Sequence, residues 1–202
     1  MGPWRLIVDP PGSPAANMAA DEELLLRVVY EGRPILRLYR WDRPAVSMGR
    51  RQKKEEIPLS VREKNLPMVR RPTGGGAVVH ATDEFTYALA LCRAEIPSGM
   101  PLRELPCFLH RRLRDLIVEQ ECIRPDDIIL FGADPKDPAP VCFSAPVRGD
   151  LIHAGKKIAG AALRVWRDRA LVQGSIQKFP GRYGQLLEAF TRIAQRGFKL
   201  EG

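Results

Sequence analysis

The sequence lacks most of the features that mark membrane, secreted and metal-binding proteins. No apolar run approaches the roughly 18 residues of a membrane span, and residues 1–10 carry one cation and no long apolar stretch, unlike a signal peptide. The four cysteines, at positions 92, 107, 122 and 142, form no Cys-x-x-Cys pair, and there are only three histidines. Such spacing is poor for a zinc site and sparse for a disulfide framework. We therefore expect a cytoplasmic protein with reduced cysteines and no bound metal.

The composition is typical of a folded, basic and loop-rich protein. Apolar residues make up 45% and charged residues 28% of the 202 residues, both close to globular averages. The 17 glycines and 18 prolines follow no repeat, which indicates many loops. The net charge of +8 suits nucleic acid, an anionic membrane or an acidic protein partner, and charge alone does not choose among them.

Hydrophobic periodicity predicts helices and strands in an irregular order. We expect four helices. The first has Asn17 as its N-cap and ends at 32–34, and the last has Gly197 as its C-cap. Their ranges are 17–31, 58–64, about 105–117 and about 186–193. We expect strands at 4–8, 35–41, 45–48, 68–71, 77–80, 85–92 and 128–130, a loop at 134–140, and an antiparallel meander of 150–153, 157–166 and 170–176. The spacing is too irregular for a doubly wound βαβ series, so the predicted class is α+β.

Residues 70–80 form a glycine segment with the sequence Arg-Arg-Pro-Thr-Gly-Gly-Gly-Ala-Val-Val-His. Three glycines between strands permit positive φ and let a ligand approach the backbone closely. The two arginines could supply charge to a carboxylate or phosphate. A flexible hairpin with solvent-exposed arginines is an equally simple interpretation. Neither a Walker loop nor a dinucleotide fingerprint fits this glycine spacing.

Residues 155–160 form a lysine segment with the sequence Gly-Lys-Lys-Ile-Ala-Gly. In a regular strand Lys156 would share the inward face of Ile158, unless a bulge at Gly155 or a strand start at Lys157 shifts the register. A lysine held at a pocket can stabilise a developing oxyanion. Solvent-facing turn lysines are the commoner case for an isolated pattern of this kind.

Cys142 lies between Pro140 and Pro146, which places it in a loop. A loop thiol near a lysine can have a lowered pKa and act as a nucleophile. The alternative is a small buried apolar residue, which is the usual role of one cysteine. Cys92, Cys107 and Cys122 fall in strand or helix patterns, and we assign them to packing.

Four blocks of the sequence together resemble the catalytic domain shared by lipoate–protein ligases, lipoyl/octanoyl transferases and biotin–protein ligases. They occur in the family's order and cover most of the chain. The blocks are 17–22 (Asn-Met-Ala-Ala-Asp-Glu), the strand pair 38–41 and 46–50, the glycine segment, and the lysine segment followed by 173–176.

The resemblance implies an α+β fold over residues 1–202, as one catalytic domain without the ligase accessory domain. Its mixed, mostly antiparallel sheet would be flanked by helices and surround an acyl tunnel. Lys157 would contact the acyl carbonyl, and the substrate-binding residues would be Arg70, Arg71, Thr73, Gly74, Gly75, Gly76, His80, Gly155, Ile158, Ala159 and Gly160. The acyl donor would be acyl carrier protein or H protein. The acceptor would be a lysine of an acidic lipoyl domain or of the glycine-cleavage H protein, which suits the basic charge.

The family divides into ATP-dependent ligases and transferases that use a cysteine thioester. Cys142 and the lysine segment resemble the octanoyltransferases whose nucleophile precedes the lysine, so Cys142 and Lys157 are the predicted catalytic residues. The ligase pattern Asp-x-Gly-Asn after His80 is absent, although the spacing from His80 to Tyr87 is that of the ligases. A transferase would need no cofactor, whereas a ligase, the alternative, would need ATP and Mg²⁺, either alone or completed by a second chain. A non-catalytic nucleic-acid-binding protein is the third candidate, and the missing helix-turn-helix extension counts against it.

Overall fold

The computed structural model describes residues 2–120, 123–133 and 140–199, and their strands form two sheets. The large sheet has the order β1-β2-β6-β10-β9-β8-β7, and the small sheet has the order β4-β3-β5. The strands are β1 Arg5–Val8, β2 Ile35–Tyr39, β3 Ala45–Met48, β4 Met68–Arg70, β5 Val78–His80, β6 Phe85–Cys92, β7 Ile128–Leu130, β8 Leu151–His153, β9 Lys156–Trp166 and β10 Arg169–Ile176. The α-helices are α1 Pro14–Glu31, α2 Leu59–Arg62, α3 Leu105–Glu119 and α4 Tyr183–Arg196, and short 3₁₀ turns span Lys54–Glu56, Arg93–Glu95, Leu102–Glu104 and Pro125–Asp127.

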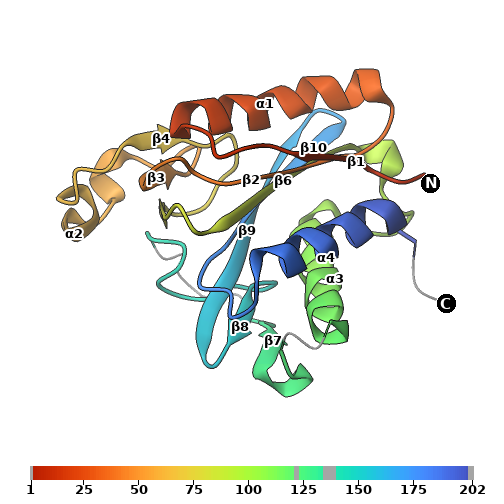
Figure 1. Ribbon diagram of the computed structural model, residues 1–202. Coiled ribbons are helices and arrows are strands. Elements are labelled where there is room, and N and C mark those ends of the chain that lie inside the picture. Colours follow the sequence, from red (N-terminus) through yellow and green to blue (C-terminus); the bar gives the residue numbers. More distant parts are fainter. Residues whose placement is uncertain (1, 121–122, 134–139, 200–202) are drawn as a thin grey trace.

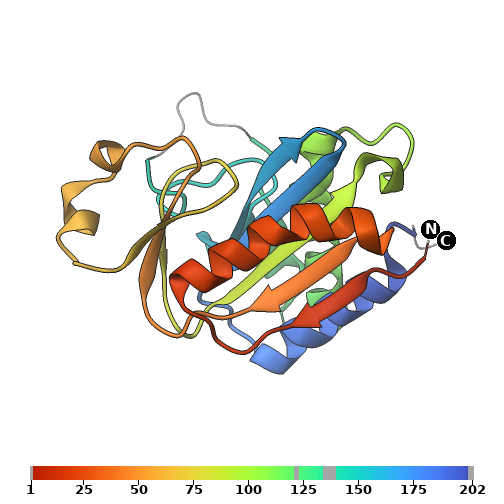
Figure 2. The same ribbon diagram turned by 90° about the horizontal axis from the view of Figure 1, so that it is seen from above.

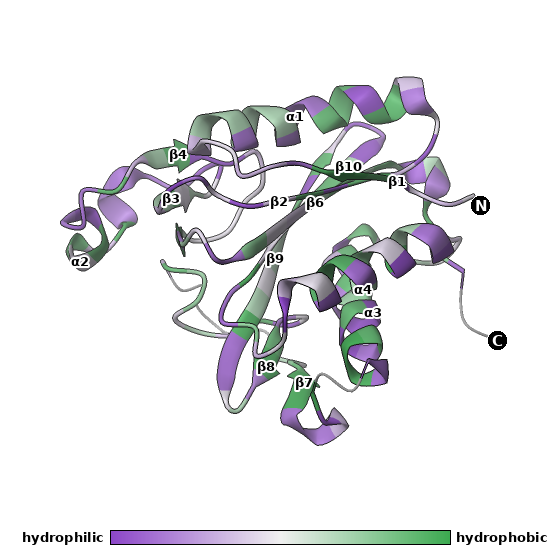
Figure 3. Cartoon of the chain, viewed as in Figure 1, coloured by the Kyte–Doolittle hydropathy of each residue, from purple (hydrophilic) through white to green (hydrophobic). Residues whose placement is uncertain are grey.

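Helices cover both faces of the large sheet. Helix α1 lies on one face, α3 and α4 lie on the other, and the small sheet with α2 forms a lobe at one end (Figures 1 and 2). Leu24, Leu25 and Val28 of α1 pack into one core layer, and Leu109, Leu113 and Phe190 of α3 and α4 pack into the other. Both α3 and α4 alternate hydrophobic and hydrophilic surface (Figure 3), which is the pattern of a helix with one buried face.

The architecture confirms the predicted α+β class with a mostly antiparallel sheet, because only β1 and β2 pair in parallel in the large sheet. The strand boundaries agree with the prediction to within two residues. Most of the predicted loop at 134–140 and Cys122 lie outside the described residues. In the part of the chain that the structure covers, no helix combines the length and apolar character needed to cross a bilayer.

One local prediction, the start of helix α1, was wrong, and the alternative of a hairpin at the glycine segment is excluded. Helix α1 begins three residues before Asn17, because Pro14 suits a first helical position and the Ser13 hydroxyl accepts a hydrogen bond from the Ala16 N–H. Asn17 is instead buried, and its amide donates to the carbonyls of Gly12 and Arg40. The strands on either side of the glycine segment do not pair with each other, because β4 and β5 both pair with β3.

The β8–β9 hairpin decides which of two adjacent lysines is buried. Ala154 and Gly155 form its turn with positive φ at both positions, as two-residue hairpin turns require. Leu151 pairs with Ala159, but the next residue of β8 pairs with Lys157, so the register shifts by one residue at Ile158. The bulge turns Lys157 inward while Lys156 stays exposed. The strand therefore begins one residue earlier than predicted, and the bulge lies further along it.

Helix α3 carries a buried histidine that couples stability to pH. His110 is 1% exposed; its ring hydrogen-bonds the carbonyl of Gly149 through Nδ1 at 2.5 Å and the Tyr87 hydroxyl through Nε2 at 2.8 Å. Burial is the main cause that lowers the pKa of His110 to about 4. In the unfolded chain His110 binds a proton once the pH falls below its ordinary pKa. In the folded chain it stays neutral until the pH is near 4. Between these two values the unfolded chain binds more protons, so acidification favours unfolding.

We expect the free energy of unfolding to lose about 3 kcal/mol through this residue by roughly pH 4, with the loss beginning near pH 6.5. Denaturant unfolding of the wild type and of His110→Asn across that range measures the effect. The asparagine keeps a donor for the Gly149 carbonyl and removes the titrating group. The prediction is wrong if the free energy of unfolding depends on pH equally in the two proteins. His153→Asn, in β8, is the matched control.

Candidate active site

The 140–149 loop places Cys142 beside the end of the glycine segment. The Ala77 N–H donates to the Pro140 carbonyl at 2.9 Å, and the Cys142 N–H donates to the Ala77 carbonyl at 2.8 Å. These two hydrogen bonds extend the small sheet by one bridge, between Ala77 and Val141. The cysteine backbone is therefore fixed, although the residue lies outside any strand.

Lys157 reaches this cysteine from β9. Its Nζ lies 2.7 Å from the Cys142 carbonyl oxygen and 3.7 Å from Cys142 Sγ. The ammonium also lies 4.9 Å from the centroid of the Phe143 ring, within the range of a cation–π contact. A cation at this distance stabilises a thiolate, which is the nucleophilic form of cysteine.

Asp150 fixes the lysine from the other side. Its Oδ2 lies 2.6 Å from Lys157 Nζ, and the two side chains are 2% and 3% exposed. Burial raises the pKa of Asp150, and the Lys157 charge opposes that shift. The Val147 N–H donates a further hydrogen bond to the carboxylate. With Asp150 and Cys142 as its partners, the ammonium has little freedom to turn away.

Gly160 provides the space that the lysine occupies. A Cβ at this position would lie 2.5 Å from Lys157 Cε and 2.7 Å from its Nζ, too close for any real contact. A side chain at Gly160 would therefore displace the Lys157 ammonium from its place beside the pocket.

Arg71 organises the glycine segment from inside. It is 5% exposed, and its guanidinium donates to the carbonyls of Gly74, Gly76 and Ser47. Burial is the main cause that lowers the pKa of Arg71, while the nearby Cys142 acts in the opposite direction. The arginine thus lines the same pocket as Cys142 and holds the loop around its guanidinium, whose donors are used by backbone carbonyls.

Gly49 and Gly75 allow this loop to lie close to the small sheet. A Cβ at Gly49 would come within 1.9 Å of the Gly75 carbonyl oxygen, so a side chain cannot fit there. Gly75 has φ +84°, in the left-handed region that favours glycine, and a Cβ on it would lie 3.0 Å from Arg71 Nη2.

We expect Gly75→Val to lose acyl binding by at least about tenfold, because a β-branched residue is strained at positive φ and would displace the Arg71 guanidinium. The fall in melting temperature is expected to be modest, since the loop lies at the surface. Titration with a labelled octanoyl donor measures binding, and Gly99→Val is the control: it also has positive φ, lies in a distant loop and has nothing within 4 Å of its Cβ. If Gly75→Val binds the octanoyl donor with wild-type affinity, the glycine segment is a turn with no role in acyl binding.

A narrow, mainly apolar pocket opens beside Cys142, with a cavity volume of about 30 Å³. Apolar side chains and small residues form most of its wall: Met18, Trp41, Val78, Phe143, Gly160, Ala161, Ala162 and Gly174. Polar groups lie along one side: Tyr39, Ser47, Arg71, His80, Thr86, Gln173 and Ser175. Such a lining suits an aliphatic acyl chain with its reacting carbonyl near the thiol.

The structure brings together only some of the residues expected to bind substrate. The pocket is lined by four of them, Arg71, His80, Cys142 and Gly160. Lys157 contacts the Cys142 thiol without lining the pocket. The three glycines 74–76 line an adjoining groove with Arg50, Arg51 and Arg164. The other predicted residues lie elsewhere: Arg70, Thr73, Gly155, Ile158 and Ala159.

Arg70 and Thr73 have structural partners instead. Arg70 Nη1 donates to the carbonyls of residues 49, 50 and 52, so it ties the glycine segment to the turn after β3. Thr73 donates through its hydroxyl to the Gln173 side chain, which in turn donates to Asp21 of α1. Ile158 and Ala159 belong to the hydrophobic core, and Gly155 belongs to the hairpin turn.

Sequence reasoning missed Ser47 and Glu84 and the pairing of Asp150 with Lys157. Ser47 and Glu84 are buried around His80. Glu84 lies four residues after His80, and this spacing was the only local signal. Ser47 lies on β3, far from His80 in the sequence, and only sheet pairing brings the two together.

Comparisons with known proteins agree with the architecture and the sequence blocks. Residues 13–178 match the model of the lipoyl protein ligase A/B catalytic domain. The octanoyltransferase LipM of Carboxydothermus hydrogenoformans is 36% identical over an alignment of 184 residues, gaps included, that covers 87% of this chain and 65% of that protein. The chain thus spans slightly less than two thirds of that relative's length.

Solved structures share the fold at lower identity. A lipoate–protein ligase A bound with ATP has a TM-score of 0.68 at 24% identity, over 95% of this chain and 83% of that one. A bipartite lipoate protein ligase from Thermoplasma acidophilum, studied with its E2 lipoyl domain, has a TM-score of 0.58 at 23% identity, over 100% and 78%. Because the family model matches residues 13–178, which are most of the chain, this chain belongs to the lipoyl protein ligase A/B catalytic-domain family.

Proposed function

We propose that the protein is an acyltransferase that moves an octanoyl or lipoyl group through a thioester on Cys142 to a lysine of a lipoyl domain or H protein. The contact between Lys157 Nζ and Cys142 Sγ, at 3.7 Å beside an apolar pocket, is the observation that carries the proposal. The relatedness to LipM octanoyltransferases supports it. A ligase that activates a free acid with ATP needs no thiol, and such a contact would then have no chemical purpose.

The reaction proceeds in two displacements at the carbonyl carbon. The Cys142 thiolate attacks the donor thioester, the donor's carbon–sulfur bond breaks, and the donor leaves as its thiolate. The ammonium of Lys157 stabilises the thiolate and then the oxyanion of the tetrahedral intermediate. The acceptor amine then attacks the acyl-enzyme, the carbon–sulfur bond of Cys142 breaks and an amide forms. The nucleophile divides one difficult transfer into two easier steps.

The proposal requires no cofactor and assigns partners by charge. An acyl carrier protein or H protein would be the donor, and an acidic lipoyl domain or H protein would meet the +8 chain. The groove lined by Arg50, Arg51 and Arg164 next to the glycine loop offers a basic surface for either. The reaction belongs in the cytoplasm, where thiols stay reduced; Cys92, Cys107 and Cys142 are free.

One assay separates the proposal from its alternatives. An apo lipoyl domain is mixed with the protein and octanoyl-carrier protein, and in parallel with octanoate or lipoate plus ATP and Mg²⁺. The acceptor mass reports the product. Modification only with the thioester donor supports the transferase, and modification only with free acid and ATP identifies a ligase. No modification, together with salt-sensitive duplex binding, would favour the nucleic-acid-binding alternative.

A further inference from the structure

Three buried side chains, Ser47, His80 and Glu84, form a hydrogen-bonded chain at the polar side of the pocket. Ser47 Oγ lies 2.7 Å from His80 Nε2, and His80 Nδ1 lies 2.5 Å from Glu84 Oε1. All three are at most 4% exposed, and Ser47 and His80 line the pocket with Cys142. Arg71 Nη1 points to Ser47 Oγ at 3.3 Å, so the serine accepts from the arginine and its own hydrogen is available to His80.

The surroundings of His80 fix the ring and its tautomer. The ring stacks on Trp41 with centroids 3.9 Å apart and planes inclined by 19°. The Glu84 carboxylate accepts from four further donors: the Ala81 N–H, Thr86 Oγ1, Ser175 Oγ and Gln177 Nε2. A carboxylate so placed requires a hydrogen on Nδ1 of the histidine, which leaves the Nε2 lone pair directed at Ser47.

The other ionisable groups at the pocket are committed to different tasks. The Tyr39 hydroxyl donates to Asp21, and burial raises its pKa well above the ordinary value. The guanidinium of Arg71 is held by carbonyls, and Lys157 is paired with Asp150. Among the described residues that line the pocket, His80 therefore offers an imidazole lone pair that points along a hydrogen bond to a serine hydroxyl.

We propose that Ser47, His80 and Glu84 act as a relay that removes a proton from the acceptor amine during attack on the acyl-enzyme. This inference rests on the proposed acyl transfer. The amine nitrogen bonds to the carbonyl carbon, its proton moves to Ser47 Oγ and the serine proton moves to His80 Nε2. Collapse of the intermediate breaks the carbon–sulfur bond and expels the Cys142 thiolate beside Lys157. The imidazolium, paired with Glu84, releases the proton to solvent when the amide product leaves.

The relay predicts that the two half-reactions respond differently to loss of His80. Formation of the acyl-enzyme requires no proton from an amine, whereas transfer to the acceptor does. We expect His80→Gln to slow transfer from isolated octanoyl-enzyme to an apo lipoyl domain by at least about 100-fold. Acyl-enzyme formation is expected to fall by much less. Rapid quench and mass spectrometry of the enzyme and of the acceptor measure the two steps separately.

The pH profile distinguishes a proton acceptor from a residue that only shapes the pocket. The ionisable groups around His80 are Glu84 from its own loop, Arg71, Tyr39 from β2 and Cys142. In the wild type, the plot of the logarithm of the transfer rate against pH is expected to bend, because a side chain that accepts a proton takes part in the step. His80→Gln is expected to lack that bend. Ser47→Ala interrupts the relay and is expected to slow the same step.

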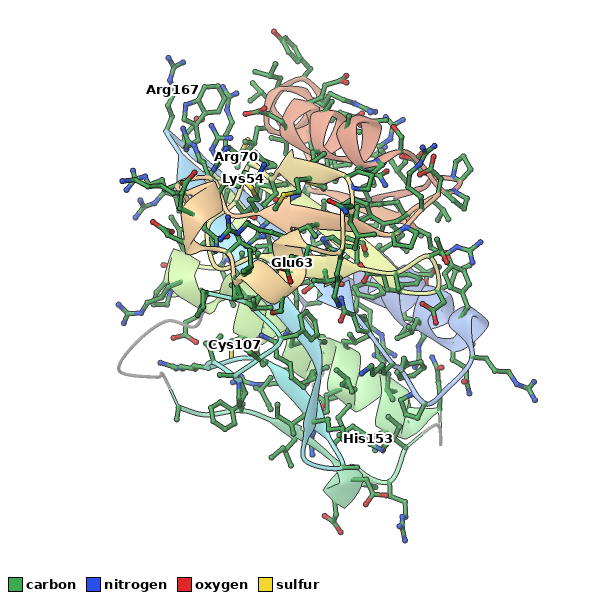
Figure 4. All side chains as sticks on the ribbon, turned by 90° about the vertical axis from the view of Figure 1, so that its left-hand side faces the viewer. Lys54, Glu63, Arg70, Cys107, His153 and Arg167 are labelled. Carbon is green, nitrogen blue, oxygen red and sulfur yellow. The ribbon has the colours of Figure 1, made fainter. Side chains whose placement is uncertain are left out.

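Hydroxylamine supplies a chemical control, because the excess reagent and the buffer accept the proton that its nitrogen loses, and the cleavage then needs no relay. It should cleave octanoyl-enzyme of the wild type and of His80→Gln at similar rates. His153→Gln is the matched histidine control. It lies on β8, far from Arg70 and Lys54 near the glycine loop (Figure 4), and should transfer at the wild-type rate.

Two outcomes overturn the relay and leave the proposed function intact. One is wild-type transfer by His80→Gln. The other is an equal loss in both half-reactions with an unchanged bend in the pH profile, which would make His80 a structural residue. If the wild-type enzyme forms no octanoyl adduct at all, the proposed function fails, and the relay fails with it.

Discussion

The Cys142→Ser variant is expected to lose both acyl-enzyme formation and turnover by at least about 10³-fold, because a hydroxyl is a far weaker nucleophile than a thiolate. Incubation of the wild type with an octanoyl-thioester donor and no acceptor should add one acyl mass. The adduct should be labile to hydroxylamine, as thioesters are. Intact-protein mass spectrometry measures the adduct, and the lipoyl-domain assay measures turnover.

Selective alkylation gives an independent check on this thiol. Cys142 lies beside the Lys157 ammonium, whereas burial raises the pKa of the Cys92 thiol, with Glu95 and Asp168 acting in the same direction. We expect iodoacetamide to modify Cys142 before Cys92. Cys92→Ser is the matched variant and should keep its turnover. Full ATP-dependent activity with a free acid in Cys142→Ser would make the protein a ligase and the cysteine a packing residue.

The Lys157→Ala variant is expected to lose acyl transfer by about 10²- to 10³-fold, the cost of removing one oxyanion donor. It should also lower the free energy of unfolding by about 3 kcal/mol, because Asp150 is left buried without its cation. The double variant Asp150→Asn with Lys157→Met removes both charges, and it should regain stability while staying inactive. Denaturant unfolding and the transfer assay report the two effects separately.

Lys156→Ala is the control that the hairpin supplies. Lys156 is exposed and adjacent to Lys157, so its removal should cost less than about threefold in turnover and less than about 0.5 kcal/mol in stability. If Lys156→Ala is inactive and Lys157→Ala is active, the register of β9 differs from the one described, and the roles of the two lysines are exchanged.

The amino-acid sequence by itself determined the class of the fold and the segments that carry chemistry. Period-two and helical patterns are local properties, so strands such as Phe85–Cys92 and the helix at Leu105–Glu119 follow from apolar spacing. The glycine and lysine segments and the order of the four blocks pointed to the ligase-like family, and a match over residues 13–178 confirmed it. Pro140 and Pro146 on either side of Cys142 were enough to place this cysteine in a loop.

Only the tertiary structure decided which side chains meet. Arg70 and Arg71 are adjacent in sequence, yet Arg71 lines the pocket with Cys142 and Arg70 holds the turn after β3. Lys157 faces Cys142 because of a one-residue shift at Ile158, and no local pattern fixed the position of that bulge. Ser47 meets His80 because β3 pairs with β5, a contact between residues 33 positions apart. Such contacts depend on which strands pair and on which groups lie close enough to pair with each buried charge. Both are properties of the folded chain and not of any one segment.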